Sequence, residues 1–405
     1  MTAAPPPAQV TCCIVGGGPA GIMLGFLLAR TGVAVAVLEK HRDFLRDFRG
    51  DTIHPSTLQV IAELGLLDGF LALPHTEIGE LHGIVGNSDI KIGDFSHLPT
   101  RCRFIALMPQ WDFLNFMAAR GADYPGFHLA MEAEAIDLIE EGGRIAGVRG
   151  QIHEAPFEIR ADLVVGADGR HSVVRERAGL QVKRFGAPID VLWMRVSKRP
   201  GDPPQTAGRF NYGRLFISLD RGDYLQCAYV IRKDGYAEVR ERGLDALRAD
   251  IARIAPHLAD RLGELRDWDD VKLLTVTVDR LERWWRPGLL CIGDAAHAMS
   301  PMGGVGINLA IQDAVAAANI LAQPLRQGTL ADAHLAAVQQ RRMLPTRLTQ
   351  AAQVFMQDRV INRALGTDKP IAAPWLLRLF NHVSLLPRIP ARIVGMGFRP
   401  EHVRI

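Results

Sequence analysis

Residues 10–39 read VTCCIVGGGPAGIMLGFLLARTGVAVAVLE, and this stretch decides the fold. An apolar run over 10–15 leads into a glycine-rich turn over 16–21. A helical pattern follows and leads to a second apolar run over 33–38, which ends at Glu39. Strand, GxGxxG turn, helix, strand and acid in this order are typical of the βαβ unit that binds a dinucleotide. The sequence therefore predicts an α/β protein built on a doubly wound parallel sheet.

The glycines of this turn have separate physical roles. Gly16 permits the tight turn, Gly18 lets the backbone approach a pyrophosphate, and Gly21 allows the helix to pack closely on the strand. The helix that begins at Pro19 and Ala20 presents N–H groups and the positive end of its dipole to the phosphates. We therefore expect a dinucleotide at this turn.

Glu39 indicates which dinucleotides suit the unit. Its carboxylate can accept hydrogen bonds from both ribose hydroxyls of an adenosine and repels a 2′-phosphate, which favours FAD or NAD over NADP. Further along, Arg49 has a fork of donors suited to a second phosphate contact, although the turn-rich segment 49–55 can also be a simple connector.

Two later motifs extend the cofactor interpretation. In residues 163–172, LVVGADGRHS, Asp168 is either an ordinary helix cap or, with Arg170, a contact to the pyrophosphate and ribose of a cofactor. In residues 289–308, LLCIGDAAHAMSPMGGVGIN, Asp294 ends a strand where it can accept hydrogen bonds from a polyol such as ribitol. The glycines at 303, 304 and 306 expose N–H groups at the start of the next helix. A helix start of this kind favours the negative charge of a reduced flavin ring.

With three motifs in this order and spacing, the sequence resembles the class A FAD-dependent aromatic hydroxylases typified by para-hydroxybenzoate hydroxylase, over about residues 8–330. The resemblance implies FAD as cofactor, NADPH or NADH as a transient electron donor without a Rossmann domain of its own, and O₂ and an aromatic small molecule as substrates. Hydroxylation would proceed through a flavin C4a-hydroperoxide. It further implies an FAD domain formed by residues 1–75, 101–185 and 279–345, an inserted β-sheet substrate domain formed by 76–100 and 186–278, and a C-terminal helical segment over 346–405.

The resemblance also assigns site residues. Gln110 stands where relatives often carry an Arg or Gln that contacts the flavin, although it can also be a solvated residue at a helix start. The cofactor-binding positions assigned in this way are Gly16, Gly18, Pro19, Ala20, Gly21, Glu39, Lys40, Arg49, Gln110, Asp168, Arg170, Asp294, Pro301, Gly303, Gly304, Val305, Gly306, Ile307 and Asn308.

Substrate residues are expected on the strands over 190–196, 208–219 and 222–231. Alternation places Tyr224 and Gln226 on one face of the last strand, and with Tyr212 and Met302 they are the candidate substrate contacts. Aromatic residues in strands are also ordinary core residues. No Arg or Lys occurs over 224–230, where benzoate hydroxylases anchor a carboxylate, so a larger neutral or phenolic ring system is favoured.

The catalytic candidates are His54 and Pro301. His54, with Asp51, could assist deprotonation of the substrate if the loop that carries them borders the ring, whereas His297 is expected to be a packed histidine that only orients its turn. Two alternative functions remain open: an FAD-dependent reductase or oxidase of an isoprenoid or quinone-like substrate, and a non-catalytic FAD-binding redox module.

The C-terminal segment carries an apolar stripe at helical spacing. It is formed by Trp375, Leu376, Leu379, Phe380, Val383 and Leu386. We expect the stripe to pack across the two domains. A membrane-surface helix or a dimer helix is the alternative.

Composition excludes several other classes. A chain of 405 residues that is 48% hydrophobic can bury a large core, and a net charge of +3 is no footprint for nucleic acid. Five cysteines without a CxxC pair favour reduced thiols in the cytoplasm and no metal site. No stretch of about eighteen uncharged apolar residues occurs, so no membrane span is expected. A monomer or homodimer is expected.

Overall fold

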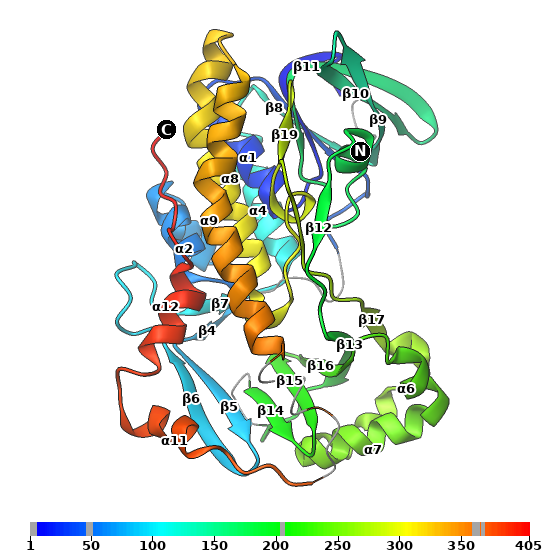
Figure 1. The fold of residues 1–405 in the computed structure, drawn as a ribbon, viewed down its shortest axis with the longest axis vertical. Helices are drawn as coiled ribbons and strands as arrows, with labels where there is room; N and C mark the ends of the chain where they lie inside the picture. Colours follow the sequence, from blue (N-terminus) through cyan, green and yellow to red (C-terminus); the bar gives the residue numbers. More distant parts are fainter. Residues whose placement is uncertain (1–5, 46–51, 203–206, 359–364, 366–368) are drawn as a thin grey trace.

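A parallel sheet with helices packed against it forms the larger half of the computed structural model, which describes residues 6–45, 52–202, 207–358, 365 and 369–405 (Figure 1). Its strand order is β19-β20-β11-β1-β2-β8, and the pairs from β20 to β8 are all parallel. The strands are β1 (Gln9–Val15), β2 (Val35–Glu39), β8 (Phe127–Met131), β11 (Ala155–Gly166), β19 (Trp285–Arg286) and β20 (Leu289–Cys291). The antiparallel strands β9 (Ala133–Glu141) and β10 (Arg144–Ile152) extend this sheet from β11. The predicted α/β fold class is confirmed.

The central strands are apolar on both faces because helices cover them. Cys12, Ile14 and Val37 are fully buried, as expected for a parallel sheet between helical layers. Helix α1 packs against α8 and α4, and α8 packs against α9. These helices are α1 (Pro19–Arg30), α4 (Gln110–Gly121), α8 (Val305–Gln327) and α9 (Asp332–Met356). In Figure 1, α9 runs lengthwise from beside this sheet towards the second sheet.

Helix α8 together with the turn before it is the single described helix long and apolar enough to cross a membrane. Its span Met302–Gln327 has a hydropathy of 1.4, and 78% of its apolar window is buried inside the protein. It therefore behaves as the core helix of a folded domain.

The second sheet has the order β17-β13-β16-β15-β14-β5-β6 and is antiparallel except between β14 and β5. Its strands are β5 (Glu80–Val85), β6 (Ser88–Asp94), β13 (Ile189–Ser197), β14 (Ala207–Asn211), β15 (Arg214–Asp220), β16 (Tyr224–Arg232) and β17 (Lys272–Leu274). Helices α6 (Tyr236–Arg242) and α7 (Leu244–Ile254) follow β16, and α7 covers one face of the sheet.

The prediction of a single strand over 208–219 is wrong. Residues Tyr212 and Gly213 form a two-residue turn between β14 and β15, with φ values of +51° and +65°. Two positive φ values are what a tight hairpin turn of the primed type requires, and a glycine at the second position makes it accessible. Tyr212 therefore lies in a turn and not on a strand.

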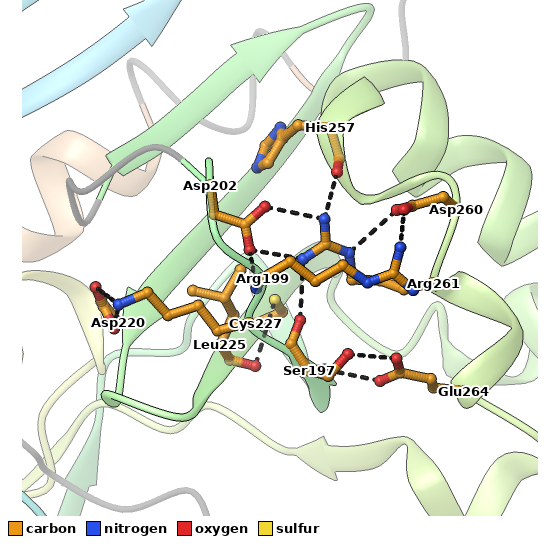
Figure 2. A network of polar contacts seen from close by, with 11 residues as sticks. Ser197, Arg199, Asp202, Asp220, Leu225, Cys227, His257, Asp260, Arg261 and Glu264 are labelled. Atoms are coloured by element: carbon orange, nitrogen blue, oxygen red, sulfur yellow. Dashed lines mark hydrogen bonds and ion pairs between the residues drawn. The ribbon is translucent and has the colours of Figure 1, made fainter.

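A buried ion pair lies beside the end of β13 in the second sheet (Figure 2). The Arg261 guanidinium donates to both Asp202 oxygens, at 2.6 and 2.9 Å, and to the carbonyl oxygens of Ser197 and His257 at 3.1 and 3.0 Å. The Arg261 hydrogen bonds lower the pKa of Asp202. This network joins the end of β13 to the 3₁₀ turns η1 (Pro256–Leu258) and η2 (Leu262–Glu264).

Smaller elements connect the two sheets. A three-stranded sheet has the order β3-β7-β4, and a two-stranded sheet pairs β12 with β18. The remaining elements are β3 (Thr52–Ile53), α2 (Pro55–Glu63), α3 (Leu67–Leu71), β4 (Thr76–Ile78), β7 (Ile105–Leu107), α5 (Val173–Arg177), β12 (Val182–Arg184), η3 (Trp268–Asp270), β18 (Asp279–Leu281), η4 (Gly293–Ala295), η5 (Met302–Gly304), α11 (Trp375–His382) and α12 (Arg388–Met396).

Candidate active site

The first glycine turn meets the second motif directly. A Cβ added at Gly16, whose φ is +108°, would lie 2.4 Å from the carbonyl oxygen of Ala167, and one at Gly21 would lie 1.9 Å from that of Gly16. Neither position accepts a side chain without a backbone shift. The Ala167 amide donates to the Val15 carbonyl at 2.7 Å, so the two turns end neighbouring strands side by side.

Gly18, at the start of α1, faces open space. Apart from its two chain neighbours, no atom of the described residues lies within 4 Å of the Cβ that a side chain would place there. No side chain caps α1, and its first turn contains no acidic residue. Unpaired N–H groups and an uncompensated dipole at an open helix start suit a pyrophosphate, so this end of the sheet fits the phosphates of FAD.

Glu39 lies at the end of β2 beside the same turn. Its Oε2 accepts the Gly17 amide at 3.1 Å and its Oε1 accepts the His41 amide at 3.0 Å. These bonds fix the carboxylate where the ribose of a bound adenosine is expected. Lys40 is exposed, and Arg49 and Asp51 lie outside the described residues.

The side chain of Asp168 accepts two hydrogen bonds at the start of α5, whose N-cap residue is Ser172. Its Oδ1 accepts the Ser172 hydroxyl at 2.5 Å and its Oδ2 accepts the Val174 amide at 3.2 Å. Burial raises the pKa of Asp168, although these hydrogen bonds oppose the shift. Arg170 reaches the third motif, because its guanidinium lies 3.6 Å from the Asp294 carboxylate.

The third motif contains two glycines whose backbone lies in the left-handed region. Gly303 and Gly304 have φ values of +75° and +62°, and a Cβ at Gly304 would lie 2.0 Å from the Thr52 hydroxyl. Pro301 precedes this turn, and Val305, Gly306 and Ile307 begin α8, which has no side-chain cap and no acidic first-turn residue. The turn therefore offers N–H groups to a ligand.

Asn308 fastens this turn to β3 and α2. Its Nδ2 donates to the carbonyl oxygens of Thr52 and Gly304 at 2.9 and 3.1 Å. Its Oδ1 accepts the His54 amide at 2.9 Å and the Thr57 hydroxyl at 2.7 Å. All four hydrogen-bonding positions of the amide are occupied, so this side chain holds the turn in place. Thr52 carries no motif of its own, and the sequence interpretation missed it.

His54 is fully buried beside the same turn. Its Nδ1–H donates to the Val394 carbonyl at 2.7 Å, and its Nε2 has no hydrogen-bond partner among the described residues. Burial lowers the pKa of His54 to about 4. The ring is therefore neutral near pH 7 and offers an acceptor nitrogen. Gln110 is half-buried at the first position of α4.

A buried charge network supports the third motif from behind. Asp313, in the middle of α8, accepts the Gly293 amide at 3.1 Å, His297 Nε2 at 2.5 Å and Arg342 Nε at 2.8 Å. Arg342 also lies 3.3 Å from Glu401. Burial would raise the pKa of Asp313, but His297 and Arg342 outweigh it and lower that pKa. His297 is thus packed and bonded, as expected. Asp313 was missed, although an aspartate inside an apolar helix is a signal of a buried partner.

The apolar face of the second sheet meets the third motif. Met302 packs against a cluster on this face that consists of Ile189, Val191, Trp193, Leu215, Ile217, Ala228, Val230 and Leu274. Tyr224 and Gln226 alternate with Ala228 and Val230, so they lie on the same face. The cluster lies beside the turn of Gly303 and Gly304, where a ring could be enclosed between sheet and turn.

Tyr212 lies apart from the other three substrate candidates. Its ring lies 4.1 Å from the Arg253 guanidinium of α7. Arg214 pairs with Asp250 of α7 at 2.7 Å, and the Tyr229 hydroxyl donates to the same aspartate at 3.3 Å. These residues stabilise the packing of α7 on the sheet. Trp193 was missed, although alternation with Val191 and Arg195 could have placed it on the apolar face.

Comparisons with known proteins identify the family of this chain. A family profile described as an FAD binding domain matches residues 9–352. The chain is 35% identical over 399 residues to the 6-methylpretetramide 4-monooxygenase of Streptomyces rimosus, covering 96% of this chain and 95% of that protein. It is 29% identical over 322 residues to the rifampicin monooxygenase of Streptomyces venezuelae, covering 74% of this chain and 61% of that longer protein.

A solved structure shows the same fold. The crystal structure of PqsL, a probable FAD-dependent monooxygenase from Pseudomonas aeruginosa, is similar with a TM-score of 0.75 at 23% identity. The match covers 88% of this chain and 97% of that chain. Both the parallel sheet and the second sheet are therefore shared architecture.

Proposed function

This chain belongs to the FAD-binding domain family and is a class A flavin-dependent aromatic monooxygenase, and from this premise we propose that its substrate is an aromatic polyketide of the pretetramide type. The observation that carries the proposal is the 35% identity to 6-methylpretetramide 4-monooxygenase along nearly the whole of both chains. The apolar sheet face beside Met302 supports it, because a large fused ring system needs such a wall.

The proposed reaction inserts one oxygen atom into a ring C–H bond. Substrate, O₂, NAD(P)H and a proton give the hydroxylated product, water and NAD(P)⁺, so the electrons from the nicotinamide reduce the second oxygen atom to water. FAD supplies the redox chemistry when it is bound. The protein contributes binding, orientation and exclusion of water.

We assign the binding roles by position. The open helix start at Gly18 would hold the pyrophosphate, Glu39 the adenosine ribose, and Asp294 with Arg170 the ribitol side. The N–H groups of the turn from Pro301 to Gly306 would stabilise negative charge on the ring. Each assignment rests on the family motif together with the local geometry described above.

The roles of His54 and Pro301 are proposals of a different kind. A histidine whose pKa is about 4 is a weak base at neutral pH, so we propose that His54 acts through its acceptor Nε2, towards a donor on cofactor or substrate. Pro301 would shape the turn. The cytoplasmic location and a monomeric or dimeric state stay predictions.

The decisive experiment adds pretetramide-type and simpler phenolic compounds to the FAD-loaded protein and follows NAD(P)H oxidation. We expect a polycyclic compound to accelerate it at least tenfold and to gain one ¹⁸O atom from ¹⁸O₂. Acceleration accompanied only by H₂O₂ would indicate an oxidase. Bound flavin that no compound affects would indicate a redox module, and either outcome would refute the proposal.

A further inference from the structure

Helices α11 and α12 turn apolar side chains outward. Trp375 and Leu376 are 69% and 57% exposed, and Leu385 and Ile389 are 63% and 60% exposed. We call the exposed set the apolar edge, and it consists of Trp375, Leu376, Val383, Leu385, Ile389 and Ile393. The expectation that this stripe packs across the two domains is wrong for Trp375, Leu376 and Val383.

The orientation of α11 is fixed by a polar contact on its inner side. Asn381 Nδ2 donates to the Asp89 carbonyl at 2.6 Å and its Oδ1 accepts the Lys91 amide at 2.9 Å, so Asn381 faces β6. At about 100° per residue, Trp375 and Leu376 then project away from the sheet. Figure 1 shows both helices on the outer side of β6 at one end of the molecule.

The inner side of α12 is also fixed to the protein, in this case by apolar packing. The exposed apolar side chains on its outer side therefore belong to a well-packed helix. Ala391 and Met396 are buried against Phe95 and Leu98. Ile389 and Ile393, one turn apart, lie on the exposed side. Both helices therefore have an anchored inner face and an apolar outer face.

The segment that forms the apolar edge carries charge of one sign. Residues 369–400 contain one lysine and four arginines and no aspartate or glutamate. Arg378 and Arg392 are exposed, and neither forms an ion pair with another described residue. The acids nearby lie on β6 and β5: Glu80 is paired with Lys91 at 2.7 Å, Asp89 contacts His82 at 2.9 Å, and Asp94 accepts the Ser96 amide at 2.9 Å. The segment that carries the apolar edge is itself basic and free of acids.

We propose that the apolar edge is a docking surface for an anionic lipid bilayer, with α11 and α12 lying in the interface. Exposed tryptophan, leucine and isoleucine flanked by cations without acids match the chemistry of interfacial helices. A second copy of the chain fits less well, because both copies would bring a basic segment without acidic residues, 369–400, to the contact. The proposal is independent of the substrate assignment.

The test is flotation of the full chain with vesicles of equal parts phosphatidylglycerol and phosphatidylcholine, compared with pure phosphatidylcholine vesicles. We expect binding to the anionic vesicles at least tenfold stronger, decreasing with added salt. Ile389→Glu and Trp375→Glu should each reduce it at least tenfold. Arg392→Gln should reduce it roughly fivefold, as expected for one cation near the surface.

The matched control is Leu344→Glu, which replaces a 53% exposed leucine on α9, outside the apolar edge. It should leave vesicle binding unchanged, and circular dichroism checks that all variants fold. Absence of binding to anionic vesicles at low salt, or an equal loss in the control, would overturn the proposal. So would a dimer that Trp375→Glu converts to a monomer, because the face would then be covered by a second copy.

Discussion

Replacement of Asp313 by asparagine tests whether the buried network behind the third motif maintains the cofactor site. The variant keeps the shape of the side chain but removes the charge that Arg342 and His297 face at 2.8 and 2.5 Å. Arg342 is then left with Glu401, at 3.3 Å, as its remaining carboxylate. In the variant, the side-chain NH₂ group can also take the place of the carboxylate oxygen that accepts the Gly293 N–H, so that two donors face each other.

The expected cost is large because both partners are inaccessible to water. Asp313 and Arg342 are 0% and 1% exposed, and breaking such a pair by removing one charge typically costs about 3–5 kcal/mol. Marginal domains have about 5–15 kcal/mol in total. We therefore expect a large loss in the free energy of unfolding, together with weaker FAD retention, since Gly293 and Asp294 form the turn that Asp313 holds.

The assays are urea unfolding and titration of apoprotein with FAD. A matched control is Glu158→Gln, which removes a carboxylate paired with Arg149 at 2.8 Å on the exposed surface, where such pairs contribute little. We expect no measurable change in the control. If Asp313→Asn unfolded at the same urea concentration as the control and bound FAD equally well, the reasoning would be refuted.

Three further predictions concern separate parts of the site. Gly18→Ala should leave thermal stability unchanged, because no described residue other than the chain neighbours lies within 4 Å of the added Cβ. It should weaken FAD binding at least tenfold, because the new methyl group obstructs the pyrophosphate. The control is Gly263→Ala, at an equally open position, and equal FAD affinity of the two variants would contradict the assignment. His54 has a pKa of about 4 against an ordinary 6.5, so the unfolded chain binds the extra proton between these pH values. The contribution of the neutral ring to the free energy of unfolding is therefore complete above pH 6.5 and falls by about 3 kcal/mol as pH drops to 4. The variant His54→Asn should lose this part of the pH dependence of urea unfolding. An unchanged pH profile would count against burial of His54 as its cause. Trp193→Ala should raise KM for the aromatic substrate several-fold with FAD affinity preserved, whereas a loss of FAD binding alone would place Trp193 outside the substrate wall.

The βαβ unit could be predicted from the sequence because its determinants are local. The spacing of Gly16, Gly18 and Gly21 specifies a turn whose backbone geometry few other residues allow, and alternating apolar runs specify the strands beside it. Periodicity within ten residues carries this information.

Contacts between distant segments could not be predicted in this way. Asp313 pairs with Arg342 and through it with Glu401, 29 and 88 residues further along the chain, and no local pattern indicates such partners. The turn at Tyr212 and Gly213 was missed because polar and apolar side chains alternate over residues 209–212, as they do in a strand. The orientation of α11 depends on Asn381, whose partners on β6 are about 290 residues away.

The link from Glu401 through Arg342 to the Gly293 turn also has a bearing on synthesis in the cell. Since chains emerge from the ribosome with the N-terminal end first, the first nucleotide-binding turn can form early, whereas the turn near Gly293 lacks part of its support until Glu401 has been synthesised. Loading with FAD should therefore be completed only after residue 401 has left the ribosome. A chain that stops before Glu401 should still form the first turn but retain flavin poorly.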